Sequence, residues 1–263
     1  MEPPQQEASV RPPGLFRLLL EARAPFEYAA SLVAAPWLLS APRGDGHAVL
    51  VYPGLLASDL STRPLRRLLR TLGHDARGWE QGRNLGARSD VFDQALGRVR
   101  AVRAETGRNV SLVGWSLGGL YARELAKMAP EAVRVVVMLG SPFTGPRDAS
   151  NARRTYEWLQ RGRAQSPHRH EDLRAPPPVP TTSIYTRADG IVAWQCSVET
   201  PGPMAENIEV HASHLGLGVN PLALYALADR LAQPEGAWRP FDRSGARRVL
   251  YPDPQRDIGE FGR

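Results

Sequence analysis

The sequence predicts one α/β domain, with a mostly parallel central sheet flanked by helices and a cap segment inserted into it. Short apolar runs rich in β-branched residues alternate with segments of helical spacing, the order expected of parallel strands joined by right-handed crossovers. The clearest strand, residues 133–139 (VRVVVML), is apolar almost throughout, as suits a strand covered on both faces. The 263 residues are enough for one such domain with a sizeable core.

The expected elements follow one another along the chain with turn signals between them. The first strand, residues 48–52, stops at Pro53-Gly54. Further strands are expected at 74–79, 109–114, 133–139, 181–186 and 207–211. Apolar residues at helical spacing predict helices at 61–72, 90–106, 117–128 and 221–231.

The domain is expected to occupy residues 46–233, preceded by a polar tail and amphipathic helices over residues 1–45. Residues 14–40 are interpreted as two amphipathic helices separated near Pro25. We expect them to pack against the domain. Contact with a membrane surface, or a part in a substrate tunnel, is the alternative.

Two segments do not fit the alternation of strands and helices. Residues 145–180 carry seven arginines and three consecutive prolines, and a stretch of this length inside a domain is usually functional or disordered. We interpret it as the inserted cap, with one helix near residues 155–160. Residues 234–263 have only scattered aromatic residues and are expected to form an irregular tail.

Composition excludes several classes of partner. The formal net charge is +6, but Lys127 is the only lysine, and the arginines are dispersed with no nucleic-acid-binding signature. No nucleic-acid partner is therefore expected. Cys196 is the single cysteine, so neither an intramolecular disulfide nor a thiolate metal cluster can form, and no metal is expected.

The amino-terminal residues and the apolar stretches of the chain bear on its localisation. Residues 1–13 lack the basic and apolar regions of a signal peptide. The strongest apolar stretch, residues 29–41, is shorter than a membrane span and is interrupted by Pro36. A cytoplasmic protein is expected, with peripheral membrane association as the alternative.

The sharpest chemical signal is Gly114-Trp115-Ser116-Leu117-Gly118, between an expected strand and an expected helix. A serine at such a turn is lifted above the sheet edge, and the small residues two positions away let the turn close. The helix that begins at Leu117 directs its positive end towards the same place. We interpret Ser116 as a nucleophile.

A serine hydroxyl needs a base, and His214 is the best-placed histidine because it follows the last expected strand. The nearest rival, His211, lies within or at the end of that strand, where its ring is expected to pack. The other histidines are His168 and His170, in the cap, and His47 and His74, which precede strands at the opposite edge of the sheet.

The base needs a carboxylate to orient it, and Asp189 follows the preceding strand, giving the chain order Ser, Asp, His. As a turn aspartate before a glycine, Asp189 has a structural role as its alternative. Asp148, one strand earlier, is the alternative acid. Metal ions and organic cofactors are not required by this chemistry.

A tetrahedral intermediate also needs amide donors for its oxyanion. Leu117 supplies one by its position after the nucleophile, and the second is expected from the loop after the first strand. Leu55 is the preferred donor there and Leu56 the second choice. Leu56, Trp115 and Trp194 are also candidates for substrate contact, with core packing as the alternative for the two tryptophans.

These motifs resemble the α/β-hydrolase superfamily, specifically its bacterial lipase- and esterase-like members. The resemblance covers roughly residues 46–233 and is carried by VYPGLL, LVGWSLGG, SIYTRADGIVAW and ASHLGLGVNP. It implies an acyl-enzyme mechanism, with Ser116, Asp189 and His214 as nucleophile, acid and base. Many lipase-like members have His-Gly where this chain has Pro53-Gly54.

The expected function is hydrolysis of a small-molecule carboxylic ester, with an apolar acyl group. Two alternatives stay open. The same triad would serve acyl transfer or thioester cleavage, where the arginine-rich cap would meet a phosphate-bearing substrate. The other alternative is a non-catalytic scaffold that binds a ligand or partner. The sequence does not determine the oligomeric state.

Overall fold

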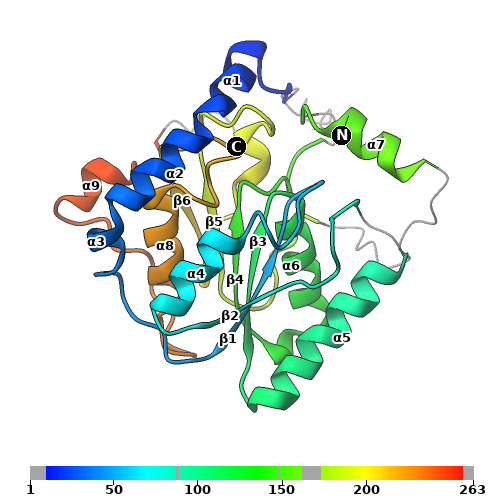
Figure 1. The fold of residues 1–263 in the computed structure, drawn as a ribbon, viewed down its shortest axis with the longest axis vertical. Coiled ribbons are helices and arrows are strands. Elements are labelled where there is room, and N and C mark those ends of the chain that lie inside the picture. The colour runs from blue at the N-terminus through cyan, green and yellow to red at the C-terminus, as the bar shows by residue number, and fades with distance from the viewer. Residues whose placement is uncertain (1–9, 87–88, 147–148, 162–172, 257–263) are drawn as a thin grey trace, which may run out of the picture.

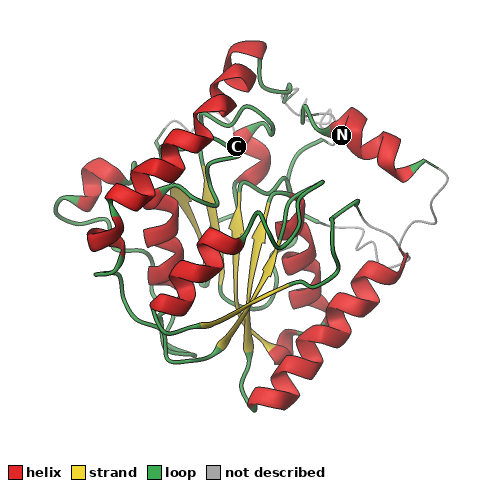
Figure 2. Cartoon of the chain, in the orientation of Figure 1, coloured by secondary structure: helices red, strands yellow, loops and turns green. Residues whose placement is uncertain are grey.

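Six strands form the centre of the structure, in the order β2-β1-β3-β4-β5-β6 (Figures 1 and 2). The structure is a computed structural model that describes residues 10–86, 89–146, 149–161 and 173–256. All neighbouring strands pair in parallel. The order reverses direction between β1 and β3, and the crevice beyond the carboxyl ends of strands at such a point is where open α/β sheets place their sites.

The strands are short, as expected of a sheet of this kind. Their bounds are β1 (Ala48–Tyr52), β2 (Asp75–Gly78), β3 (Val110–Trp115), β4 (Val133–Leu139), β5 (Thr181–Tyr185) and β6 (Ala205–Glu209). The helices are α1 (Leu15–Leu20), α2 (Ala24–Val33), α3 (Ala35–Leu38), α4 (Arg63–Thr71), α5 (Ser89–Thr106), α6 (Leu117–Met128), α7 (Arg153–Gln160), α8 (Pro221–Leu231) and α9 (Arg247–Leu250), with short 3₁₀ turns η1 (Glu21–Arg23), η2 (Pro130–Ala132) and η3 (Trp194–Ser197).

Helices cover both faces of the sheet, so the domain has three layers (Figure 1). On one face α3, α4 and α8 pack against side chains that include Val135 and Val137; on the other, α5 and α6 pack against Val136 and Met138. Alternate residues of β4 therefore enter different cores, which explains why the whole strand is apolar.

The predicted fold class is confirmed, and most elements lie where the sequence places them. β6 is an exception, because it occupies residues 205–209 rather than 207–211. This strand is at the edge of the sheet, and its first residues, Ala205, Glu206 and Asn207, are only half buried. Its start therefore lacks the apolar run by which a strand is recognised in sequence.

The amino-terminal helices contact the domain, but α1 and α2 do not do so through their apolar faces. They form α1, η1, α2 and α3, and the residues that they bury against the domain include Glu21 and Ser31. In α1 and α2 the large apolar side chains are exposed instead, whereas Leu38 of α3 is buried. The exposed side chains are Leu15, Phe16, Leu18, Leu19, Phe26, Tyr28, Leu32 and Val33. The loops beneath these helices present N–H groups that have no backbone partner. Acidic side chains of the helices face inwards and accept hydrogen bonds from them. Contact of the apolar face with a membrane surface stays a prediction.

Within the described ranges, no helix is both long enough and apolar enough to cross a membrane.

The cap segment runs between β4 and β5 and contributes α7, which lies at the upper right of Figure 1. A buried ion pair fixes the far end of this segment to the domain. Arg123 in α6 pairs with Glu199, and its guanidinium also donates to the carbonyl oxygens of Leu173 (2.8 Å) and Arg174 (2.7 Å). Cap residues 162–172 lie outside the described residues.

The tail after α8 contributes to the core. Phe241 and Tyr251 are buried, contact each other edge to face, and belong to the cluster on the α8 side of the sheet. Most of this segment is irregular, as expected, but it includes the short helix α9.

The amino edge of the sheet holds a buried polar chain that resembles a catalytic relay. His47 Nδ1 lies 2.5 Å from Asp45 Oδ1, and its Nε2 lies 2.7 Å from Ser111 Oγ. His47 and Ser111 are almost completely buried, so no substrate can reach this serine. His74 contacts the His47 ring edge to face, with its own ring nitrogens buried and without a hydrogen-bond partner among the described residues.

Burial lowers the pKa of His74 to about 4, and the nearby His47 acts in the same direction. A histidine that is neutral when folded gains protons on unfolding below its unfolded pKa of 6.5. Its contribution therefore destabilises the fold progressively as the pH falls from 6.5 towards 4. We expect His74→Phe to reduce the loss of unfolding free energy between pH 7 and pH 5 by about 1–2 kcal/mol. Urea unfolding of both proteins at the two pH values measures this, and an equal loss in both would contradict it.

Candidate active site

Ser116 lies at the sharp turn between β3 and α6, in a left-handed backbone conformation with φ 53° and ψ −121°. A residue with a β-carbon adopts a positive φ only where the surroundings enforce it. Here the Ser116 N–H donates to Leu139 at the end of β4 (2.8 Å), and its carbonyl accepts from Gly119 (3.0 Å). The turn therefore holds the serine at the carboxyl edge of the sheet, as predicted.

The glycines around Ser116 permit a close approach of backbone segments. A β-carbon at Gly114 would lie 2.3 Å from the Gly118 carbonyl oxygen, and one at Gly118 would lie 2.2 Å from that of Tyr52. The spacing of glycines in the motif thus follows from packing of α6 directly against β3 and β1.

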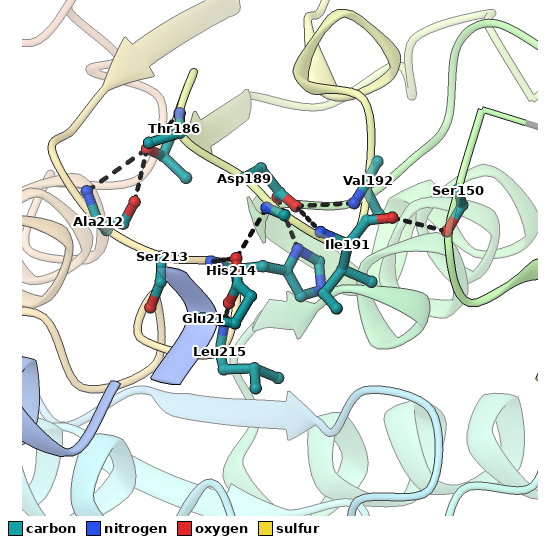
Figure 3. A network of polar contacts seen from close by, with 12 residues as sticks. Glu21, Ser150, Thr186, Asp189, Ile191, Val192, Ala212, Ser213, His214 and Leu215 are labelled. Carbon is teal, nitrogen blue, oxygen red and sulfur yellow. Dashed lines mark hydrogen bonds and ion pairs between the residues drawn. The ribbon is translucent and has the colours of Figure 1, made fainter. Parts of the chain in front are cut away.

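Asp189 and His214 form a buried pair on the loops after β5 and β6 (Figure 3). His214 Nδ1 donates to Asp189 Oδ2 at 2.6 Å, while Asp189 Oδ1 accepts from the amides of Ile191 (2.8 Å) and Val192 (2.7 Å). Burial disfavours the charged ring, but the Asp189 carboxylate, assisted by Glu21, outweighs it and raises the pKa of His214.

His214 and Ser116 are brought to neighbouring strand ends. Gly140, directly after β4, would carry a β-carbon 3.2 Å from His214 Nδ1, and its neighbour Leu139 accepts from Ser116. Within the described residues His214 Nε2 makes no hydrogen bond. Catalytic serine–histidine bonds are often long before substrate binds.

The loop after β1 passes beside the nucleophile. A β-carbon at Gly54 would lie 3.3 Å from Ser116 Cβ, so glycine allows this approach. The Leu56 amide donates to the Asn84 carbonyl (2.7 Å), whereas the Leu55 amide makes no hydrogen bond within the described part of the chain. The Leu55 amide is therefore available to a ligand.

The loop depends on Asn84, which the sequence analysis missed. This completely buried side chain donates from Nδ2 to the Pro53 carbonyl (2.8 Å), and its Oδ1 accepts from Tyr121 Oη (3.2 Å). The Asn84 backbone bonds to Leu56 and to Ala57. A lone asparagine between two elements carries no signal in sequence, because its partners are backbone atoms of a distant loop.

Two other missed residues come from the amino-terminal segment. Glu21 and Glu27 accept hydrogen bonds from backbone amides of the loops after β5 and β6. Each lies more than 150 residues away in sequence from these partners, so no local pattern reveals the contact.

The two tryptophans proposed as substrate contacts have protein partners. Trp115 donates from Nε1 to the His214 carbonyl oxygen (3.0 Å) and packs against the core. Trp194 stacks on Tyr185 and lies under the Arg187 guanidinium. Their contact with substrate stays a prediction, as does that of Leu56, which is 43% exposed.

The residues considered as alternatives for the base and the acid lie elsewhere in the chain or outside the described residues. His211 does not pack as expected: β6 ends at Glu209, so His211 lies in the following loop and is exposed. His47 and His74 lie at the opposite edge of the sheet. Asp148, His168 and His170 lie outside the described residues.

Among the residues that the structure describes, no group of three or more His, Cys, Asp or Glu side chains is arranged to hold a metal ion.

Comparison with known proteins gives a family and a fold. Residues 44–258 match the model of the "Alpha/beta hydrolase family". Lipase B of Aspergillus fumigatus is similar in structure, with a TM-score of 0.55 and 18% identity, and the match covers 73% of this chain and 54% of that one. This chain thus spans about half the length of that lipase. No curated protein sequence matches the chain.

Two further solved structures are similar. The thioesterase domain from the curacin biosynthetic pathway has a TM-score of 0.48 and 16% identity, covering 73% of this chain and 93% of that one. An alpha/beta hydrolase from the sediment metagenome of the Mar Chica lagoon, Morocco, has a TM-score of 0.47 and 22% identity, covering 68% and 87%.

Replacing Asn84 tests the support of the loop beside Ser116. Asn84→Ala removes the hydrogen bonds of a buried side chain to the Pro53 carbonyl and the Tyr121 hydroxyl, which costs about 1–3 kcal/mol of unfolding free energy. We also expect labelling of Ser116 by a fluorophosphonate probe to slow by about tenfold or more, because the Leu55 amide loses its position.

Asn207→Ala is the matched control, since Asn207 bonds similarly to the backbone of Glu199 but lies away from this loop. It should lower stability and leave labelling unchanged. Equal slowing in both variants would show that Asn84 has no particular effect on the loop.

Proposed function

The chain belongs to the alpha/beta hydrolase family, and from this premise we propose that Ser116, His214 and Asp189 form a catalytic triad that hydrolyses carboxylic esters. The observation that carries the proposal is the combination of a strained serine turn with a buried His214–Asp189 pair at the same edge of the sheet. The family implies hydrolase chemistry, and the roles of the individual residues are our inference.

The proposed reaction begins when His214 Nε2 takes the proton of Ser116 as Oγ attacks the ester carbonyl carbon. Asp189 holds Nδ1–H, so that Nε2 is the basic nitrogen, and stabilises the imidazolium. His214 then protonates the leaving alcohol, and an acyl-enzyme remains. His214 then deprotonates a water molecule, which attacks the acyl carbon. The bond to Ser116 Oγ breaks, His214 returns the proton to Oγ, and the carboxylic acid leaves.

The negative oxygen of each tetrahedral intermediate needs donors that are already in place. We assign this role to the amides of Leu117 and Leu55. Leu117 is the first residue of α6, where backbone N–H groups have no partner within the helix. The Leu55 amide lies next to Gly54, which approaches Ser116 closely.

Two partly exposed leucines support an apolar acyl group. Leu56 follows the proposed donor in the loop beside Ser116, and Leu215 follows the proposed base; they are 43% and 48% exposed. Apolar surface of this kind favours contact with a hydrocarbon chain over a charged one.

The central prediction concerns the nucleophile. Ser116→Ala should reduce kcat for p-nitrophenyl esters by about a thousandfold or more, because no residue replaces the acyl acceptor. Assays with acyl groups from short to long would also identify the preferred chain length. Ser111→Ala is a suitable control, since it removes the other serine that bonds to a histidine, and it should leave kcat unchanged.

Wild-type protein that folds but hydrolyses none of these esters would contradict the proposal. Product analysis with a competing alcohol separates the alternative, acyl transfer, from hydrolysis.

The pH dependence of kcat/KM tests the base. Since His214 must be neutral to accept a proton and its pKa is raised, activity should increase with pH along a limb whose midpoint lies above 6.5. Asp189→Asn removes the main charge that raises this pKa, so the midpoint should move to lower pH and kcat should fall by about 10³–10⁴-fold. An unchanged midpoint would exclude this carboxylate as the partner of the base.

A further inference from the structure

Glu21 is a buried carboxylate beneath the amino-terminal helices, in the 3₁₀ turn η1 between α1 and α2. Only 4% of the residue is exposed. Within the described residues it forms no ion pair. A buried carboxylate without a counter-ion is costly unless hydrogen bonds compensate it, and such a group calls for an explanation.

Three backbone amides supply that compensation (Figure 3). Glu21 Oε1 accepts from Gly190 N (2.7 Å) and from His214 N (3.0 Å), and Oε2 accepts from Leu215 N (2.8 Å). Gly190 directly follows Asp189, so one carboxylate is bonded to both the loop of the proposed acid and the loop of the proposed base.

The packing around Gly190 shows that this contact is specific. A β-carbon at Gly190 would lie 2.3 Å from the Arg17 carbonyl oxygen of α1. Any other residue at position 190 would therefore separate the amino-terminal segment from the loop after β5.

We propose that Glu21 is a positioning residue of the triad, which fixes the separation of the Asp189 and His214 loops and stabilises the protonated state of His214 through its charge. This inference rests on the proposed function. Glu21 has two separate effects in this proposal. Its hydrogen bonds to the loop amides hold His214 Nδ1 at Asp189 Oδ2. Its negative charge stabilises the His214 imidazolium that forms during each step.

Among the described residues, three other charged side chains bond to the His214 ring or to the loop that carries it. Asp189 contacts the ring, Glu27 accepts from the Ser213 amide (2.8 Å), and Arg23 donates to the Ala212 carbonyl. Arg23 also pairs with Glu27 (3.2 Å), which compensates the Glu27 charge. Of the two glutamates, only Glu21 contributes to raising the pKa of His214.

Glu27 is therefore a matched control. It lies on the adjacent helix α2, is mostly buried, and accepts from Ser213 N and from Asn220 Nδ2 (2.8 Å each). It holds only the loop after β6 and has no contact with the Asp189 loop among the described residues. A substitution at Glu27 should loosen the attachment of the amino-terminal helices without changing the pKa of His214 or its contact with Asp189.

The test compares Glu21→Gln with Glu27→Gln. Glutamine removes the charge at position 21 and presents a donor to one of the three amides. We expect the midpoint of the kcat/KM profile to fall by about half a pH unit or more, since a neighbouring negative charge is lost. We expect kcat at the plateau to fall by about tenfold or more while KM changes less than threefold. Glu27→Gln should lower the thermal midpoint of unfolding and leave the pH midpoint unchanged.

Glu21→Asp separates the effect of the negative charge from that of the hydrogen bonds to the loop amides. Its shorter side chain keeps the charge near His214 but cannot bond all three amides, so the pH midpoint should stay near that of the wild type while kcat falls. Equal effects of the Glu21 and Glu27 variants, with no change in midpoint, would overturn the proposal and leave Glu21 a structural residue only.

An NMR titration of the His214 ring in wild type, Glu21→Gln and Glu21→Asp tests the charge without any substrate. If the wild type hydrolyses no ester, a lower ring pKa in Glu21→Gln still supports the positioning role, and only the proposed function fails. If Ser116→Ala abolishes hydrolysis but Glu21→Gln titrates like the wild type, only the role of Glu21 fails.

Discussion

The left-handed backbone at Ser116 is the constraint on which the rest of the site depends. A residue with a side chain holds this conformation only if its neighbours leave no alternative, and here β3, β4 and α6 enclose it. The turn needs glycine at 114 and 118, because α6 then packs against β3 and β1 without space for a β-carbon. The positions of the proposed nucleophile, of the first turn of α6 and of the loop after β1 thus depend on the same close packing.

Around that turn, two buried carboxylates, those of Asp189 and Glu21, accept hydrogen bonds from backbone amides rather than from arginine. Asp189 accepts from two amides of its own loop, and Glu21 accepts from three amides of two loops. Among the described residues neither forms an ion pair with arginine or lysine, and both contribute to raising the pKa of His214. The inverted amphipathicity of the amino-terminal helices has the same origin, because the loops at this edge present donors and therefore attract acidic side chains.

The chain contains two arrangements of serine, histidine and aspartate, and their comparison shows that hydrogen-bond geometry alone does not identify a site. Ser111, His47 and Asp45 are hydrogen-bonded in series at the amino edge. Ser111 lies within β3 and is completely buried, with ladder partners on both sides. Ser116 lies five residues after Ser111 and directly follows the same strand, at the carboxyl edge, where the chain turns into α6. Position on the sheet separates this structural chain from the proposed catalytic one.

By itself the sequence determined the layers, the strand order along the chain and the places of Ser116, Asp189 and His214, because each depends on local patterns: apolar periodicity, glycine spacing and the end of a strand. The half-buried start of β6, the exposed His211 and the outward apolar face of α1 and α2 were decided by tertiary structure. Asn84 and Glu21 also escaped detection, since each bonds to backbone amides and carbonyls far along the chain. Backbone partners are the same at every residue, so only the folded arrangement decides which of them a buried side chain meets.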